Sequence, residues 1–147
     1  MNINNVVGTI TTRDKVLMAE AFLKEQPQVQ LETNHYFSKG VYAREIKIPA
    51  GIILTGEIHK FENLNILSKG SMQVSTEDGI KEVEAPFTVV SPAGTKRIAY
   101  TLSDCVWTTI HGTNETDLKI IEHTFIAKSE QEWLEFAGAN QLELGFN

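Results

Sequence analysis

The sequence predicts an all-β protein, an antiparallel barrel or sandwich with one helix before it and one after it. Two observations lead to this fold class. Between residues 35 and 127, short stretches with strand character are separated from one another by Gly, Pro, Asn, Asp or Ser. Before and after that region, apolar residues recur at helical spacing. Many short strands at regular spacing favour antiparallel sheets, because parallel strands need long crossover connections.

The first helix is expected at residues 11–26. Apolar side chains recur there at helical spacing, Thr11 or Thr12 is available as the N-cap, and Pro27 stops the helix. The strands are then expected at 41–48, 52–61, 64–68, 72–76, 80–84, 88–90, 97–102, 106–111 and 118–126.

The second helix is expected at residues 129–138. Ser129 and Glu132 have the spacing of a capping box, and Gly138 is a suitable end. The tail, 139–147, has apolar residues at every second position and is interpreted as one added strand at a sheet edge, in this subunit or a neighbour; these residues are Leu142, Leu144 and Phe146.

Length and composition narrow the class of protein. The 147 residues are enough for one domain, with 41% hydrophobic and 22% charged residues as in soluble globular chains. The net charge of −6, without a basic block, argues against a nucleic acid polymer as partner. No apolar run is long enough to span a membrane. We expect a cytoplasmic protein whose one cysteine, Cys105, is a buried apolar residue rather than a disulfide partner or zinc ligand.

Residues 51–70 resemble the first motif of the cupin β-barrels, G-x5-H-x-H-x3,4-E-x6-G, with most of its metal ligands replaced. Counted from Gly51, the alignment puts Glu57 at the first histidine, His59 at the second, Asn63 at the glutamate and Gly70 at the closing glycine.

The second cupin motif, G-x5-P-x-G-x2-H-x3-N, is similar to residues 86–101. Pro92 and Gly94 match its core, whereas Pro86 stands at the leading glycine, Arg97 at the histidine and Thr101 at the asparagine. The resemblance implies a cupin-type jelly-roll barrel, or double-stranded β-helix, over 35–127. It also implies a ligand site in the barrel mouth that gathers Tyr42, Arg44, Glu57, His59, Asn63, Asn65, Arg97, Trp107 and His111.

Cupins usually hold a metal, but we expect neither a metal nor another cofactor here. Only Glu57 and His59 remain as competent ligands, Asn63 is a weak one, and Arg97 brings a positive charge to the metal position. Two arginines beside polar side chains instead suit a small anionic ligand, because guanidinium groups bind phosphate or carboxylate bidentately. Each polar residue, taken singly, is equally explained by a structural role, such as an ion pair between Arg44 and Glu57.

Residues 35–46, 59–70 and 85–97 also resemble small cupin-like proteins encoded by bacteriophages. This resemblance implies a role in host interaction, since some small oligomeric phage proteins sequester nucleotide signals of bacterial defence systems. The leading hypothesis is a non-catalytic protein that binds a small anionic, nucleotide-derived ligand.

Two alternatives stay open. The first is an enzyme, either a metal-free isomerase or epimerase with His59 as base and Glu57 or Tyr42 as its acid partner, or a metal-dependent oxygenase. The second is a structural or interaction module with a vestigial pocket. In all cases the terminal helices and the alternating tail favour a homo-oligomer, a dimer or higher.

Overall fold

The computed structural model describes residues 13–143, with side chains up to residue 140. Its elements, in chain order, are α2 (Arg13–Lys24), β1 (Glu32–Ser38), β2 (Val41–Ile48), β3 (Ile53–Thr55), β4 (Ile58–His59), β5 (Asn63–Lys69), β6 (Ser71–Thr76), β7 (Gly79–Glu84), β8 (Phe87–Ser91), β9 (Ile98–Thr101), β10 (Cys105–Gly112), α3 (Leu118–Phe125), β11 (Ile126–Ala127) and α4 (Glu130–Glu143).

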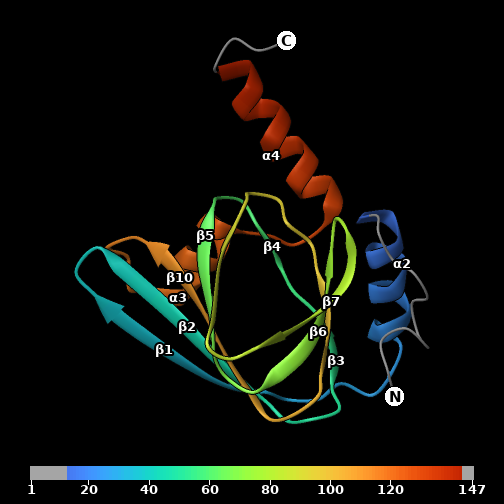
Figure 1. Cartoon of the computed structure of the whole chain (residues 1–147). Coiled ribbons are helices and arrows are strands. Elements are labelled where there is room, and N and C mark those ends of the chain that lie inside the picture. The colour runs from blue at the N-terminus through green and yellow to red at the C-terminus, as the bar shows by residue number, and fades with distance from the viewer. Residues whose placement is uncertain (1–12, 144–147) are drawn as a thin grey trace.

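The strands form the predicted jelly-roll barrel. One large sheet has the order β1-β2-β10-β5-β8 and the other the order β3-β9-β6-β7, while β4 and β11 form a separate two-stranded sheet. Every pairing is antiparallel. Apart from β1, this is the strand order of two interleaved Greek keys. Figure 1 shows the hairpin of β1 and β2 extending to one side of the barrel, with α2 against the opposite side.

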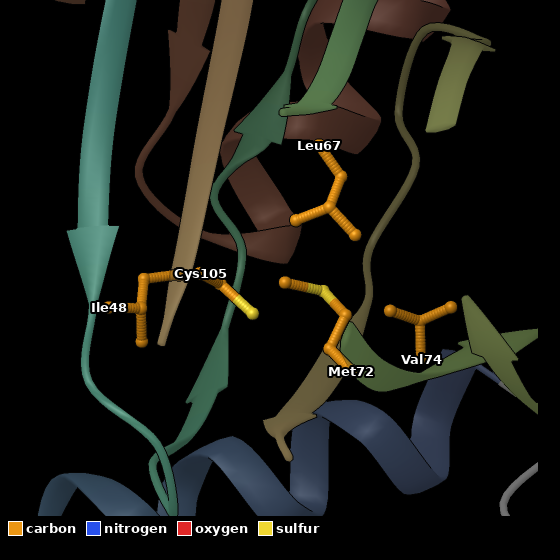
Figure 2. Packing of buried hydrophobic residues seen from close by; sticks show 5 residues of the cluster. All are labelled: Ile48, Leu67, Met72, Val74 and Cys105. Atoms are coloured by element: carbon orange, nitrogen blue, oxygen red, sulfur yellow. The ribbon is translucent and has the colours of Figure 1, made fainter. Parts of the chain in front are cut away.

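The core lies between the two sheets. Its buried residues are Ile48, Leu67 and Cys105 from the first sheet and Met72 and Val74 from the second. In Figure 2, Met72 extends between Cys105, Leu67 and Val74. Because successive residues of a strand face opposite sides, this inward set alternates with outward residues along β5 and β6. The prediction that Cys105 is buried is confirmed.

Helix α2 packs on the outer face of the second sheet, close to the predicted position. Its Val16 is buried against Ile98 of β9. Glu20 accepts hydrogen bonds from Thr55 at 2.6 Å and from Lys96, with which it forms an ion pair. The expected caps, Thr11 and Thr12, lie outside the described residues.

The predicted strand at 118–126 is wrong, because this segment forms α3 and only then the short strand β11. Asp117 caps the helix by accepting hydrogen bonds from two N–H groups of its first turn. Ile121 and Phe125, four residues apart, are both buried on one face of the helix. The apolar and β-branched residues of this segment suggested a strand, but the spacing of its buried residues is that of a helix.

Two smaller differences concern the strands. The predicted strand at 52–61 is interrupted, and β3 and β4 are separated by Gly56 and Glu57. The strand β1 was not predicted, since it is an exposed edge strand that shows no clear alternation of burial. It is held by its full register with β2, across a turn in which Gly40 has a φ of 81°.

The C-terminal helix is longer than predicted. Helix α4 continues through Gly138 to Glu143, so the expected strand in the tail is wrong for residues 139–143; residues 144–147 lie outside the described part. A glycine in a helix costs only about 1 kcal/mol relative to alanine, which its helix-compatible neighbours offset. At the start, the Ser129 hydroxyl accepts from the N–H of Glu132 at 3.1 Å, whereas the Glu132 carboxylate accepts from Lys128 at 2.8 Å, one residue before the capping-box position.

Helix α4 is attached to the loop that carries the second motif. Arg13 donates to Glu130 at 2.6 and 2.9 Å and also to the carbonyl of Gly94. Beyond this attachment, α4 projects away from the barrel (Figure 1). None of the helices found within residues 13–143 has the length and apolar character needed to cross a membrane.

We predict that Gly70→Ala destabilises the protein much more than Gly40→Ala. Both glycines have positive φ values, 89° and 81°, so each alanine is strained by about 1–2 kcal/mol. A Cβ on Gly70 would also lie 2.3 Å from the Asp104 carbonyl oxygen, whereas one on Gly40 meets nothing within 4 Å. Displacing that backbone adds roughly 1–3 kcal/mol. Urea unfolding measures both, and equal losses in the two variants would contradict this account.

Candidate ligand site in the barrel

The barrel encloses an inner cavity of about 120 Å³ between its two sheets. Its polar lining consists of Arg44, Glu57, His59, Asn63, Asn65, Ser91, Thr95, Arg97 and Thr109. Its apolar lining consists of Ile46, Ile48, Leu54, Met72, Val74, Ala99 and Trp107. The glycine and proline turns of the two motifs thus place side chains from eight strands and their loops around one space.

An outer cavity of about 270 Å³ adjoins it beneath α3. Arg44, Glu57, His59 and Thr109 line both cavities. The remaining lining of the outer cavity comes from His35, Tyr42 and His111 on the sheet and from Leu118, Ile121, Glu122, Phe125 and Ile126 around α3. The outer cavity depends on α3, which the sequence analysis had interpreted as a strand.

All the residues expected in the barrel mouth line one of these cavities, but they do not share a single one. The inner cavity holds Asn63, Asn65, Arg97 and Trp107, the outer one holds Tyr42 and His111, and the other three residues line both. Five polar residues were missed: Ser91, Thr95 and Thr109 of the inner cavity, and His35 and Glu122 of the outer one. The signal for Ser91 is present in the sequence, since it lies two residues after Val89 on the same face of β8.

Asn65 connects the polar side of the inner cavity. Its amide nitrogen donates to Asn63 Oδ1 at 2.7 Å and to Ser91 Oγ at 2.8 Å. Its oxygen accepts from Trp107 Nε1 at 3.1 Å and from Thr109 Oγ1 at 2.6 Å. Both donors and both acceptor sites of the amide are therefore used, and the Asn65 side chain is a structural hub rather than a ligand contact.

Arg97 is held by the same network. Its Nη2 donates to Ser91 Oγ at 2.8 Å, and burial lowers the pKa of the guanidinium from its usual value. No carboxylate among residues 13–140 lies within ion-pair distance of Arg97 or Arg44. The alternative of an ion pair between Arg44 and Glu57 is thus not what the structure contains.

His59 and His111 form a second polar contact, between the two cavities. His59 Nδ1 lies 2.8 Å from His111 Nε2, and the rings stack with centroids 4.9 Å apart. Burial, then His111 and the two arginines, lowers the pKa of His59 to about 3, and burial lowers the pKa of His111 to about 4. Both rings are neutral at neutral pH, with one donating to the other, so His59 Nε2 remains available for a ligand.

Tyr42 belongs to the outer cavity. Its hydroxyl lies 2.7 Å from His35 Nδ1, and burial raises the pKa of the phenol. His111 stacks on Phe125 of α3 at 4.4 Å between centroids. The outer cavity therefore combines ring faces with a few polar atoms.

The donor set of the inner cavity does not fit the metal of a cupin. Within the described part of the chain, no three side chains of His, Cys, Asp or Glu come together. Asn63 Oδ1 already accepts from Asn65, and Arg97 occupies the last ligand position of the second motif. The expectation of a metal-free barrel remains a prediction that rests on this donor chemistry.

Comparison with known proteins identifies similar folds but no family assignment from sequence. No protein-family model and no curated protein matches the chain. Similar solved structures include a cupin-2 domain-containing protein of Shewanella frigidimarina, at 14% identity over 63% of this chain and 90% of that one, with a TM-score of 0.46. An RmlC-like cupin family protein of Methanocaldococcus jannaschii is 12% identical over 58% and 82%, with a TM-score of 0.47. KdgF of Halomonas sp. is 14% identical over 63% and 88%, with a TM-score of 0.49.

We predict that Asn65→Leu lowers the free energy of unfolding by at least about 3 kcal/mol, because several buried polar groups lose their partner at once. The control is Asn34→Leu, where the side chain bonds only Glu32 and Glu45 on the edge hairpin. A surface change of that kind costs roughly 0.5 kcal/mol or less. Similar urea midpoints for the two variants would show that the network does not stabilise the barrel.

We also predict that acid destabilises the protein through the histidine pair. The unfolded histidines bind protons below pH ~6.5, whereas the folded ones resist protonation down to pH 4 or 3. The contribution of the pair to the free energy of unfolding is therefore complete above pH ~6.5. It is lost as the pH falls from 6.5 towards 4, by up to about 1.4 kcal/mol per pH unit for each histidine. Unfolding free energies measured between pH 7.5 and 4.5 should fall less steeply in His111→Gln. The exposed His123→Gln should follow the wild type, and a His111→Gln profile parallel to both would refute the assignment.

Proposed function

We propose that this protein binds a small anionic molecule in the barrel without transforming it, with Arg97 and Arg44 in contact with the anion's charge. The observation that carries the proposal is that two guanidinium groups line one cavity while no described carboxylate pairs with either. An uncompensated charge inside a protein is unfavourable, and arginine does not lose its proton to relieve it. An anion from solution supplies the missing countercharge.

The hydrogen bonds around Arg97 support a site that is ordered before the ligand arrives. Ser91 accepts from Arg97 and also from Asn65, whose amide is fixed by further partners. Only one of the guanidinium's nitrogens is used in this way, so other N–H groups stay available for a carboxylate or phosphate. A side chain that is already ordered loses less conformational entropy on binding.

The electrostatics of His59 argue for binding rather than catalysis. A general base works best when its pKa is close to the working pH, and the pKa of His59 is about 3. The arginines that suit the cavity to an anion also contribute to that lowering. The isomerase or epimerase alternative therefore lacks an effective base at His59, and the oxygenase alternative lacks a ligand set.

For the class of anion, the sequence resemblance to bacteriophage-encoded cupin-like proteins, taken by itself, favours a nucleotide-derived signal of a host defence system. Guanidinium groups bind phosphate in a bidentate manner. The outer cavity adds Tyr42, His111 and Phe125 beside Arg44. Because the faces of these rings stack on neighbouring rings, a base would contact their edges.

Calorimetric titration with inorganic phosphate, mononucleotides, cyclic nucleotides and small carboxylates tests the proposal. Removing a hydrogen-bonded charge costs about 1.5–3 kcal/mol, so we expect Arg97→Leu to weaken binding by roughly 10- to 100-fold. Lys119→Leu, which removes an exposed lysine of α3 outside both cavities, is the control and should bind like the wild type. The proposal fails if the folded wild type binds no anion of the panel, or if Arg97→Leu binds as tightly as the wild type.

A further inference from the structure

The inner cavity changes from polar to apolar along the barrel. On β2, Arg44 is followed on the same face by Ile46 and Ile48. The neighbouring strand repeats this order, since Thr109 pairs with Arg44 and Trp107 pairs with Ile46. The polar side chains of this sheet thus lie at one level of the barrel and the apolar ones at the next.

The facing sheet shows the same gradient. Leu54, Ala99 and Val74 are cross-strand partners on β3, β9 and β6, and all three line the cavity. Arg97 lies two residues before Ala99 and therefore at the polar end. Met72 continues the apolar level beyond Val74. The cavity has guanidinium groups at one end and hydrocarbon walls at the other.

This gradient determines which part of a ligand can enter. A polar group placed among the apolar side chains would lose its hydrogen bonds to water without replacement. Transferring such a group from water to an apolar environment costs about 2–7 kcal/mol. A hydrocarbon group gains about 25 cal/mol for each Å² that it removes from water. A nucleobase entering first would bury its hydrogen-bonding edge, so the walls favour a hydrocarbon group in this position.

We propose that the ligand of the inner cavity is a small organic carboxylate that carries a short branched alkyl or phenyl group. Its carboxylate contacts Arg97 and Arg44, and its hydrocarbon group lies between Leu54, Val74 and Ala99. The volume sets the upper limit, since about 120 Å³ is below the roughly 150 Å³ of an apolar cavity that holds benzene; a short branched alkyl group fits, and a phenyl ring is the largest group to test. This inference rests on the proposed anion site and replaces a nucleotide with a hydrocarbon carboxylate as the class of its ligand.

The test is a series of probes titrated into the full chain: acetate, butanoate, 3-methylbutanoate and phenylacetate, with inorganic phosphate and AMP for comparison. Each buried methylene group should tighten the dissociation constant roughly fourfold. Phenylacetate should therefore bind far more tightly than acetate, and more tightly than either phosphate or AMP.

Ala99→Leu should fill the apolar end and leave the guanidinium groups in place. We expect this variant to lose the preference for phenylacetate over acetate, measured as the ratio of the two dissociation constants. Ala139→Leu, on the exposed surface of α4, is the matched control and should keep the full series. Thermal unfolding of each variant checks that it is folded. The chain-length series of the wild type tests the inference independently of whether Ala99→Leu folds.

The outcomes separate this inference from the proposed function. If anions bind without any dependence on the hydrocarbon group, or if AMP or phosphate binds more tightly than phenylacetate, the inference is overturned and the anion site stands. If no probe binds the folded wild type, both are overturned. A rising series that disappears in Ala99→Leu supports both.

Discussion

The buried amide of Asn65 is the interaction on which the interior of this barrel depends. It connects three strands of one sheet, through Asn63 on its own strand, Ser91 on β8, and Trp107 and Thr109 on β10. A polar group of this kind is tolerated in a barrel only when every donor and acceptor has a partner. Because these bonds determine where the Ser91 hydroxyl lies, they also determine where the guanidinium of Arg97 is held.

The consequence is an interior with excess positive charge in a protein of negative net charge. Apart from Arg97 and Arg44, the groups nearest the inner cavity are neutral amides, hydroxyls and a neutral histidine, and the carboxylate of Glu57 is exposed at its rim. The surface charge of −6 does not reveal this local excess. For the proposed anion, the negative net charge would oppose a long-range approach, and the attraction would come from the arginines in the cavity.

The strand pattern predicted an antiparallel barrel or sandwich, and the resemblance to cupins implied the jelly roll and the residues around its mouth. Turns at Gly51 and Gly70 fix where a strand begins, and the period of two then determines which side chains face inward. Asn63, Asn65 and Arg97 line the inner cavity, and their role as ligand contacts stays a prediction.

What could not be predicted depends on contacts between distant segments. Residues 118–126 are compatible with either a strand or a helix, and only the burial of Ile121 and Phe125 against the sheet decides for α3. The outer cavity, and with it the separation of Tyr42 and His111 from the inner site, follows from that helix. The hydrogen bonds of Asn65 depend on the register of β5 with β8 and β10, which the alternation within one strand does not specify.

The arginines that would hold the proposed anion also act on His59, because their charges contribute to its low pKa. An anion at Arg97 and Arg44 would oppose their effect and raise the pKa of His59. Burial and His111 are the larger causes of the low pKa, however, and the ligand removes neither of them. His59 therefore stays neutral when the anion is bound, and it offers a fixed hydrogen bond rather than a transferable proton. Under the proposed function, the two cationic side chains hold the ligand and the histidine contributes only a hydrogen bond.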